Sequence, residues 1–320
     1  MITEIRLFHA ISQLLLCSIA FIMTCFDSIL LLTTLSSRSD QNIPFSYMIV
    51  MSVCGIFGKV AYIIHFATYL ILPIKTYYHY RQLLGTEVSF LGTYSYYIII
   101  LVSVLMTINR LYVMIRPFDN QAFNRNRISI YSFGIAVFCA TILLIPYFSH
   151  CPINFSADKL LFGPNCAPDA HPLSTITDHY SCLLVIILLI INTVLVIYLK
   201  ISSKIQKVST VASSLVIFQK KRERILMRQA VGVTLFLSIY EVGKFIEQTF
   251  PDTFHKLPQY AQDAYFYFRF ISVLAINFFV YYVESQTTRK LINKYLKIGA
   301  TVSTGVVTTT STSQNNQQQF

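Results

Sequence analysis

The chain has 320 residues, of which 54% are hydrophobic and only 12% are charged, and its mean hydropathy is +0.57. Ordinary soluble domains carry about 25% charged residues, so this composition excludes a typical water-soluble protein. The net charge of +11 does not indicate a nucleic-acid-binding protein, because the basic residues form no segment separate from the apolar ones.

Seven long apolar stretches follow one another along the chain. They cover residues 7–35, 45–72, 88–115, 128–148, 180–199, 225–250 and 264–283. Each has the ~20 residues that cross a hydrocarbon core, and in lipid such a segment must be a helix, since its backbone has no water to bond. The sequence predicts an all-α membrane protein, a seven-transmembrane helix bundle in one domain over residues 1–298.

The basic residues predict which end of the bundle faces the cytoplasm. With the N-terminus outside, 17 of the 25 Lys and Arg residues lie on the cytoplasmic side, six lie outside and two lie within spans. Positive charge is retained on the cytoplasmic side of membrane helices. We therefore expect a multi-pass protein of the plasma membrane with its N-terminus outside and its C-terminus in the cytoplasm.

The predicted outer loop 149–179 carries two features typical of the lumenal side of a membrane. Asn154 begins a glycosylation sequon. Cys151 and Cys166 are the only two of the seven cysteines in a predicted outer segment, and an oxidising compartment would allow them to form a disulfide. The alternative is a pair of free thiols near the membrane surface.

The third stretch ends in Asn109-Arg110-Leu111-Tyr112, and Pro117 follows. A lone arginine here would indicate an ordinary anchor that reaches the interface with its long side chain. The seventh stretch, however, holds Asn277 and Tyr281 one helical turn apart near the same face. Such buried polar groups can bond an internal water network or the arginine.

Together these residues resemble the motifs of the rhodopsin-like G-protein-coupled receptors. The Asp-Arg-Tyr motif and its later proline match Asn109, Arg110 and Pro117 in spacing, and the Asn-Pro-x-x-Tyr motif matches Asn277 and Tyr281. The departures are substantial. The Asp is Asn109, the motif proline is Phe278, no tryptophan occurs, and the second stretch lacks the usual sodium-site aspartate.

This degenerate set is more similar to that of the nematode serpentine chemoreceptors of the Srg/Srx-type groupings. The string Thr107–Phe118 carries most of the resemblance. It implies a receptor for sensory perception in chemosensory neurons and their cilia that couples to a heterotrimeric G protein. The residues it assigns to signal transduction are Asn109, Arg110, Pro117, Asn277 and Tyr281.

Basic and amphipathic segments on the predicted inner side suit such a partner. Lys220, Lys221, Arg222 and Arg224 lead into the sixth span and would meet a G protein or anionic membrane lipids. Residues 286–298 repeat apolar positions between basic ones, which predicts a short amphipathic eighth helix on the inner leaflet. Residues 299–320 are rich in Ser, Thr, Gln and Asn and are predicted to be disordered. Phosphorylation of this tail would recruit an arrestin-like protein; the alternative is a solvated linker.

Polar and aromatic residues within the spans mark a candidate pocket for a small-molecule ligand, because charges in lipid are costly and such pockets are apolar with a few polar groups. The candidates are Lys59, Tyr62, His65, Tyr94, Tyr97, Glu241, Lys244 and Arg269. Asp27 lies roughly 10 Å from the level of Lys59 by helical rise, so we do not expect these two to pair directly. The alternative is an internal Glu241–Lys244 ion pair and an interfacial belt of tyrosines.

The chain carries no enzyme, cofactor or metal-ligand motif. We therefore expect neither an enzyme nor a bound metal or cofactor. The sequence favours a receptor that binds a small molecule in an outer cavity and activates a G protein. The alternative is a seven-span ligand-gated channel or transporter, although the paired broken helices typical of transporters are missing.

Overall fold

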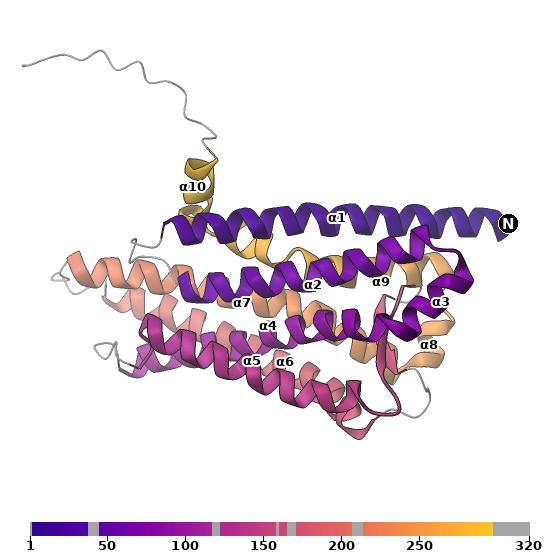
Figure 1. The fold of residues 1–320 in the computed structure, drawn as a ribbon. Helices are drawn as coiled ribbons and strands as arrows, with labels where there is room; N and C mark the ends of the chain where they lie inside the picture. The colour runs from indigo at the N-terminus through magenta and orange to yellow at the C-terminus, as the bar shows by residue number, and fades with distance from the viewer. Residues whose placement is uncertain are drawn as a thin grey trace, which may run out of the picture.

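Long helices that run side by side form the body of the protein (Figure 1). The computed structural model describes residues 2–37, 45–116, 122–157, 160–164, 171–206 and 214–296. The long helices are α1 (Ile2–Ser36), α2 (Phe45–Ile71), α4 (Gly85–Ile115), α5 (Arg125–Tyr147), α6 (Pro172–Gln206) and α7 (Ser214–Thr249). All six are long and apolar enough to cross a membrane. The structure thus has the helical membrane architecture that the composition predicts.

The expected seventh span is interrupted. Helix α9 covers Gln259–Leu274, and the chain then turns at Ala275 before the π-helix η1, Phe278–Val283. Neither piece is long enough to be a candidate span alone, so the described residues hold six candidate spans where the sequence predicts seven. Asn277 lies at this junction and donates to the Met51 carbonyl at 3.1 Å. The number of crossings and the orientation across the membrane stay predictions.

Short elements close one end of the bundle, the end at which α1 begins, which we call the N-terminal end (Figure 1). They are α3 (Ile74–Leu83), α8 (Pro251–His255) and a hairpin of β1 (Ile153–Ser156) and β2 (Leu161–Pro164). The strands are antiparallel, with Phe155 opposite Phe162. Leu160 closes the hairpin in the left-handed region at φ 50°, which is uncommon for a residue with a side chain.

Local sequence signals explain several helix ends. The Asn124 side chain accepts a hydrogen bond from the Arg127 backbone N–H at 2.9 Å, which caps the start of α5. Pro146 lies in the last turn of α5, and the helix ends one residue later. The amphipathic helix α10 (Gln286–Tyr295) lies at the end of the bundle opposite the N-terminal end (Figure 1). The Ser285 hydroxyl caps it by accepting a hydrogen bond from the Thr288 backbone N–H at 3.3 Å.

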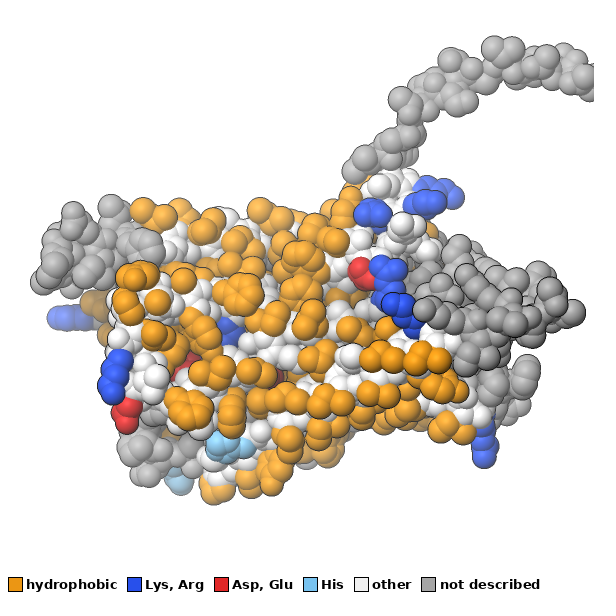
Figure 2. Space-filling view, turned by 180° about the vertical axis from the view of Figure 1, so that it is seen from behind, with side chains coloured by type: hydrophobic (Ala, Val, Ile, Leu, Met, Phe, Trp, Pro, Cys, Tyr) orange, Lys and Arg blue, Asp and Glu red, His pale blue; other side chains and the backbone are white. Residues whose placement is uncertain are grey.

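The outer surface of the bundle is apolar along the helices. Hydrophobic side chains spread over the face shown in Figure 2, and most of the Lys and Arg side chains in view lie towards its two ends. Ile11, Phe21, Phe133 and Ile190 are each more than half exposed. A helix bundle surrounded by lipid is expected to present such a surface, since its backbone polar groups are bonded internally. The chain is a multi-pass membrane protein by these features.

Candidate functional site

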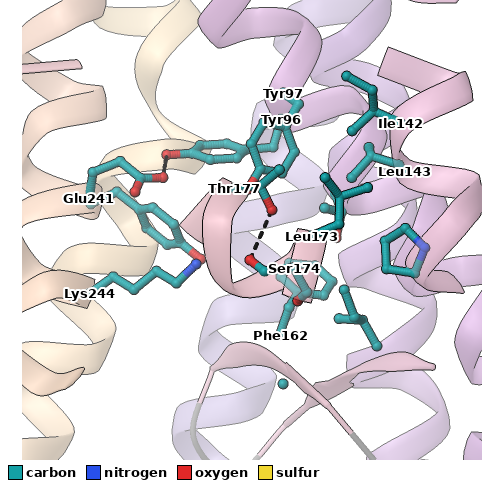
Figure 3. A pocket seen from close by; sticks show the side chains of 15 residues that line it. Tyr96, Tyr97, Ile142, Leu143, Phe162, Leu173, Ser174, Thr177, Glu241 and Lys244 are labelled. Atoms are coloured by element: carbon teal, nitrogen blue, oxygen red, sulfur yellow. Dashed lines mark hydrogen bonds between the residues drawn. The ribbon is translucent and has the colours of Figure 1, made fainter. Parts of the chain in front are cut away.

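A small cavity lies between α4, α5, α6, α7 and the hairpin, towards the N-terminal end (Figure 3). Its volume is about 50 Å³. Glu241 and Lys244 of α7 face Tyr96 and Tyr97 of α4 across it, and Phe162 of the hairpin lies at its edge. We refer to it below as the Glu241 cavity.

The Glu241 carboxylate joins three helices at this cavity. The side chain is only 1% exposed, and its two oxygens accept hydrogen bonds from the Tyr96 hydroxyl at 2.6 Å and the Ser181 hydroxyl at 2.7 Å. A buried carboxylate needs such donors, because burying an unbonded charge is costly. The network therefore fixes α7 against α4 and α6. The sequence analysis did not identify Tyr96 or Ser181. One signal for Ser181 was present, because hydroxyl residues recur every three or four positions on one face of α6, at Ser174, Thr177 and Ser181.

Three of the eight predicted pocket residues line the Glu241 cavity, namely Tyr97, Glu241 and Lys244. Arg269 lies behind it. Its guanidinium pairs with Glu247 at 3.0 Å and stands 5.2 Å from the ring of Tyr240, which does line the cavity. Arg269 is 1% exposed, so its charge is held within the protein.

Other predicted pocket residues have structural partners elsewhere. His65 lies 3.2 Å from the Ser89 hydroxyl and packs against the Phe155 ring at 5.1 Å. The Tyr94 hydroxyl donates to the Ala136 carbonyl at 3.2 Å. Tyr62 packs edge-on against Phe270 with 4.7 Å between the ring centroids, and together with Lys59 it lines a separate cavity of about 20 Å³. The structure does not bring these residues into the Glu241 cavity.

The expectation that Asp27 and Lys59 do not pair was wrong. The Lys59 ammonium forms an ion pair with Asp27 Oδ2, and both side chains are buried. A lysine side chain reaches several ångströms along its helix, so a difference in backbone level does not prevent pairing. Gly55, one turn from Lys59, leaves the space for this group. A Cβ atom there would lie 2.6 Å from the Asn277 amide nitrogen and closer still to the Asp27 carboxylate.

Of the predicted signalling residues, Asn109 and Arg110 lie towards the opposite end of the bundle, whereas Asn277 lines the cavity of about 20 Å³ together with Lys59 and Tyr62. Asn109 and Arg110 are 7% and 2% exposed, and the Asn109 amide donates to the Tyr47 hydroxyl of α2 at 3.0 Å. Tyr47 is a partner that the sequence motifs do not identify. Asn277 and Tyr281 are buried at 2% and 0% exposure around η1. The structure thus confines these groups to the interior.

Several predicted residues lie wholly or partly outside the described part of the chain. Pro117 and Cys166 are outside it. Lys220, Lys221, Arg222 and Arg224 fall within α7, but their side chains are not described. In the same helix, Arg228 forms an ion pair with Glu284, which follows η1.

The outer-loop expectations have mixed outcomes. Cys151 is disulfide-bonded; Cys166, its expected partner, lies outside the described residues, and the other five cysteines are free. Asn154 is 0% exposed. Its amide donates to the Arg81 carbonyl at 3.3 Å and accepts from the Thr86 hydroxyl at 3.2 Å. The Asn154 side chain is thus buried and hydrogen-bonded in this packing, and its glycosylation stays a prediction.

Among the described residues, no group of three His, Cys, Asp or Glu side chains is arranged to hold a metal ion.

Comparison with known proteins identifies relatives of this architecture. The family model for Caenorhabditis serpentine receptor-like protein, class xa, matches residues 42–193, a region that includes α2, α4 and the Asn109-Arg110 string. Serpentine receptor class XA 10 of Caenorhabditis elegans is 29% identical over 295 residues, which is 86% of this chain and 87% of that protein. The resemblance to nematode serpentine receptors is confirmed, and the matching class is xa. Both matches are named as serpentine receptors.

Proposed function

We propose that this chain, which is similar to a serpentine receptor of class xa over most of its length, is a G-protein-coupled chemosensory receptor. A small molecule would bind with a polar group at the Glu241 cavity, and a heterotrimeric G protein would bind at the opposite end. The observation that carries the proposal is the Glu241 carboxylate, whose two hydrogen bonds join α4, α6 and α7 beside an unfilled space.

A ligand that exchanges bonds with Glu241 changes how α7 packs. Each hydrogen bond to a charged group contributes about 1.5–3 kcal/mol, so the bonds from Tyr96 and Ser181 together are of the order of the ~5.5 kcal/mol that a near-complete switch needs. The ligand acts by favouring one of two packings of α7 against its neighbours. In this proposal, Glu241 couples occupancy of the cavity to the position of α7.

Helix α7 extends from the cavity to the opposite end of the bundle, where Arg228 pairs with Glu284. Arg110 is 2% exposed in the packing described here, so it cannot contact a partner protein in this state. Outward movement of α7 would free it. Asn109, Pro117, Asn277 and Tyr281 would complete the coupling region, and the basic residues at positions 220–224 would contact the acidic partner.

The remaining assignments follow from the same proposal. The receptor would lie in the plasma membrane of a sensory cell or its cilium, with α10 against anionic lipids of the inner leaflet. An arrestin-like protein would recognise the phosphorylated tail.

The test is a small-molecule screen in cells that express the full chain and a promiscuous G protein. Arg110→Ala is compared with Arg116→Ala, which changes the same residue type at the exposed end of the same helix. At matched surface density, we expect a compound active on the wild type to lose at least tenfold in potency or response on Arg110→Ala alone. An undiminished Arg110→Ala response would refute the mechanism, and a ligand-gated current without G-protein output would support the channel alternative.

A further inference from the structure

A second and larger cavity lies beside the Glu241 cavity. Its volume is about 370 Å³, which falls in the range of small-molecule sites. Side chains of α4, α5 and α6 line it. Phe138, Leu183 and Ile187 at its rim are 56%, 52% and 44% exposed. Because these positions lie on the apolar outer surface of the bundle, this cavity opens towards lipid. We call it the lateral cavity.

The two cavities share a wall. Tyr97, Ile142, Leu143 and Thr177 line both of them. Ser181 also lines the lateral cavity, and its hydroxyl donates to Glu241 Oε2 at 2.7 Å. The lateral cavity is otherwise almost entirely apolar. A molecule that fills it from the membrane therefore meets a mostly apolar surface. The hydroxyl-bearing side chains of its lining are Tyr97, Thr177, Tyr180 and Ser181, and Ser181 is the one whose hydroxyl donates to the Glu241 carboxylate.

The hairpin lines the Glu241 cavity on the side of the N-terminal end. Phe155 is 0% exposed and packs against Tyr62, with 5.6 Å between the ring centroids. Phe162 lines the Glu241 cavity and presses on Gly92, where an added Cβ would lie 3.2 Å from its ring. The Gln13 side-chain amide donates to the Ala157 carbonyl at 2.6 Å and so ties the hairpin turn to α1. Entry from water past the hairpin would have to displace this packed element.

The acidic and basic residues that line the two cavities are Glu241 and Lys244. Their formal charges cancel, so the site offers no net charge to attract an ion. A charged ligand would also have to enter through hydrocarbon, which strongly disfavours charges. A hydroxyl or carbonyl oxygen, by contrast, can exchange hydrogen bonds with Ser181 and Glu241 at little cost.

From this arrangement we infer that the ligand is a neutral amphiphile, a hydrocarbon chain with one hydrogen-bonding oxygen, that enters from the bilayer between α5 and α6. Its chain occupies the lateral cavity, and its oxygen meets Ser181 and Glu241. This inference rests on the proposed function, whose ligand class it names. A lipid acyl chain that fills the cavity without specific recognition has the same hydrocarbon chemistry, and the experiment below separates the two.

The test uses the full chain in phosphatidylcholine vesicles and two photoactivatable probes of equal chain length. One probe is a straight-chain alcohol that carries a diazirine, and the other is the matching alkane without the hydroxyl. We expect the alcohol to label cavity-facing residues of α5 and α6 saturably, at least tenfold more than the alkane does. Excess unlabelled alcohol should abolish that labelling.

A matched pair of variants tests the location. Ile187→Trp fills the rim of the lateral cavity, whereas Ile190→Trp makes the same change one turn further along α6, at a position that is 58% exposed and does not line it. Saturable labelling should fall at least tenfold in Ile187→Trp and stay unchanged in Ile190→Trp. Ser181→Ala should reduce labelling by the alcohol and leave labelling by the alkane as it was. If Ile187→Trp does not fold, as judged by its thermal unfolding, Ile187→Phe serves in its place.

Equal labelling by the two probes, or equal labelling of the two tryptophan variants, would identify a nonspecific lipid position and overturn the inference. The labelling needs no G protein. A chain that binds the alcohol saturably but activates no G protein would keep this inference and lose the proposed function. A chain that signals to another compound while the alcohol fails to label it would lose only this inference.

Discussion

At the scale of single residues, the buried charges organise the interior. Lys59 is paired with Asp27, Arg269 with Glu247, and Glu241 with two hydroxyl donors. Each charge would be costly in lipid without its partner. These contacts explain why the bundle tolerates ionisable residues at depth, and they identify which substitutions should matter most.

The first prediction concerns the space at Gly55. We expect Gly55→Ala to destabilise the protein by about 1–3 kcal/mol, because the new methyl group would collide with the Asp27 carboxylate and the Asn277 amide. Gly134→Ala is the control, since a Cβ there meets nothing within 4 Å, and it should be neutral or stabilising by up to ~1 kcal/mol. Thermal unfolding in detergent compares the two. Similar unfolding temperatures for both variants would show that the packing around Gly55 is not tight.

The second prediction concerns the Asp27–Lys59 ion pair. Asp27→Asn leaves the Lys59 ammonium buried without its counter-charge and should cost about 3–5 kcal/mol. Adding Lys59→Met removes the orphaned charge and should recover most of that loss. A double-mutant cycle on unfolding temperatures measures the coupling. If the double variant is less stable than Asp27→Asn, the two residues do not act as a pair.

The sequence predicts which charged residues are buried at an energetic cost. It does not predict which residues pair with them or donate hydrogen bonds to them. Lys59 and Glu241 stand out because charges are rare in apolar stretches. Their partners depend on helix rotation and side-chain reach, which a single sequence does not encode in any local pattern. Tyr96 and Ser181 look like ordinary tyrosine and serine residues until the helices are packed. Asn154 shows the converse. Its sequon can be recognised in the sequence, but the burial of its side chain cannot.

At the scale of elements, the hairpin is the largest departure from the expected organisation. The predicted outer loop contains two four-residue strands, too short to leave a clear alternating pattern. The available signal was two phenylalanines, Phe155 and Phe162, in a segment otherwise rich in turn-forming residues. The interruption of the seventh span was equally hidden, because hydropathy records that residues are apolar and not whether their backbone stays α-helical.

The third prediction tests whether the buried Phe155 side chain anchors the hairpin to the helix bundle. Phe155 is 0% exposed, so Phe155→Ala should cost about 3–5 kcal/mol. Phe148, at the end of α5, is 84% exposed, and Phe148→Ala should change stability by less than ~0.5 kcal/mol. Thermal unfolding and protease sensitivity of loop 149–179 distinguish the variants. Equal protease resistance in both would mean that the hairpin is not anchored by Phe155.

At the scale of the whole molecule, the helical membrane architecture is the part that the sequence predicts best. Each crossing must satisfy its own backbone hydrogen bonds in lipid, so length and apolarity identify most spans, here six of the seven predicted stretches. The order in which helices pack carries no comparable constraint, which is why the cavities beside α4 could not be located in advance. The distribution of the basic residues also predicts the orientation of the chain, because Lys and Arg are retained on the cytoplasmic face of a membrane.

The fourth prediction concerns the orientation of the chain across the membrane, with the N-terminus outside and the C-terminus in the cytoplasm. An epitope tag at the N-terminus should be accessible to antibody on intact cells, and a tag at the C-terminus should become accessible only after permeabilisation. A loop tag at residue 210 should behave like the C-terminal tag. Reversed accessibility would place Arg110 outside the cell and end the case for a G-protein partner.

Nucleotide exchange in sealed membrane vesicles tests the proposed receptor most directly. Inside-out vesicles expose the Arg110 end of the chain to added heterotrimeric G protein, and right-side-out vesicles hide it. With a compound from the cell screen present on both sides, the receptor should accelerate GTP binding in inside-out vesicles only, and Arg110→Ala should abolish the effect. GTP binding that the compound does not change in inside-out vesicles would contradict coupling between the Glu241 cavity and a G protein.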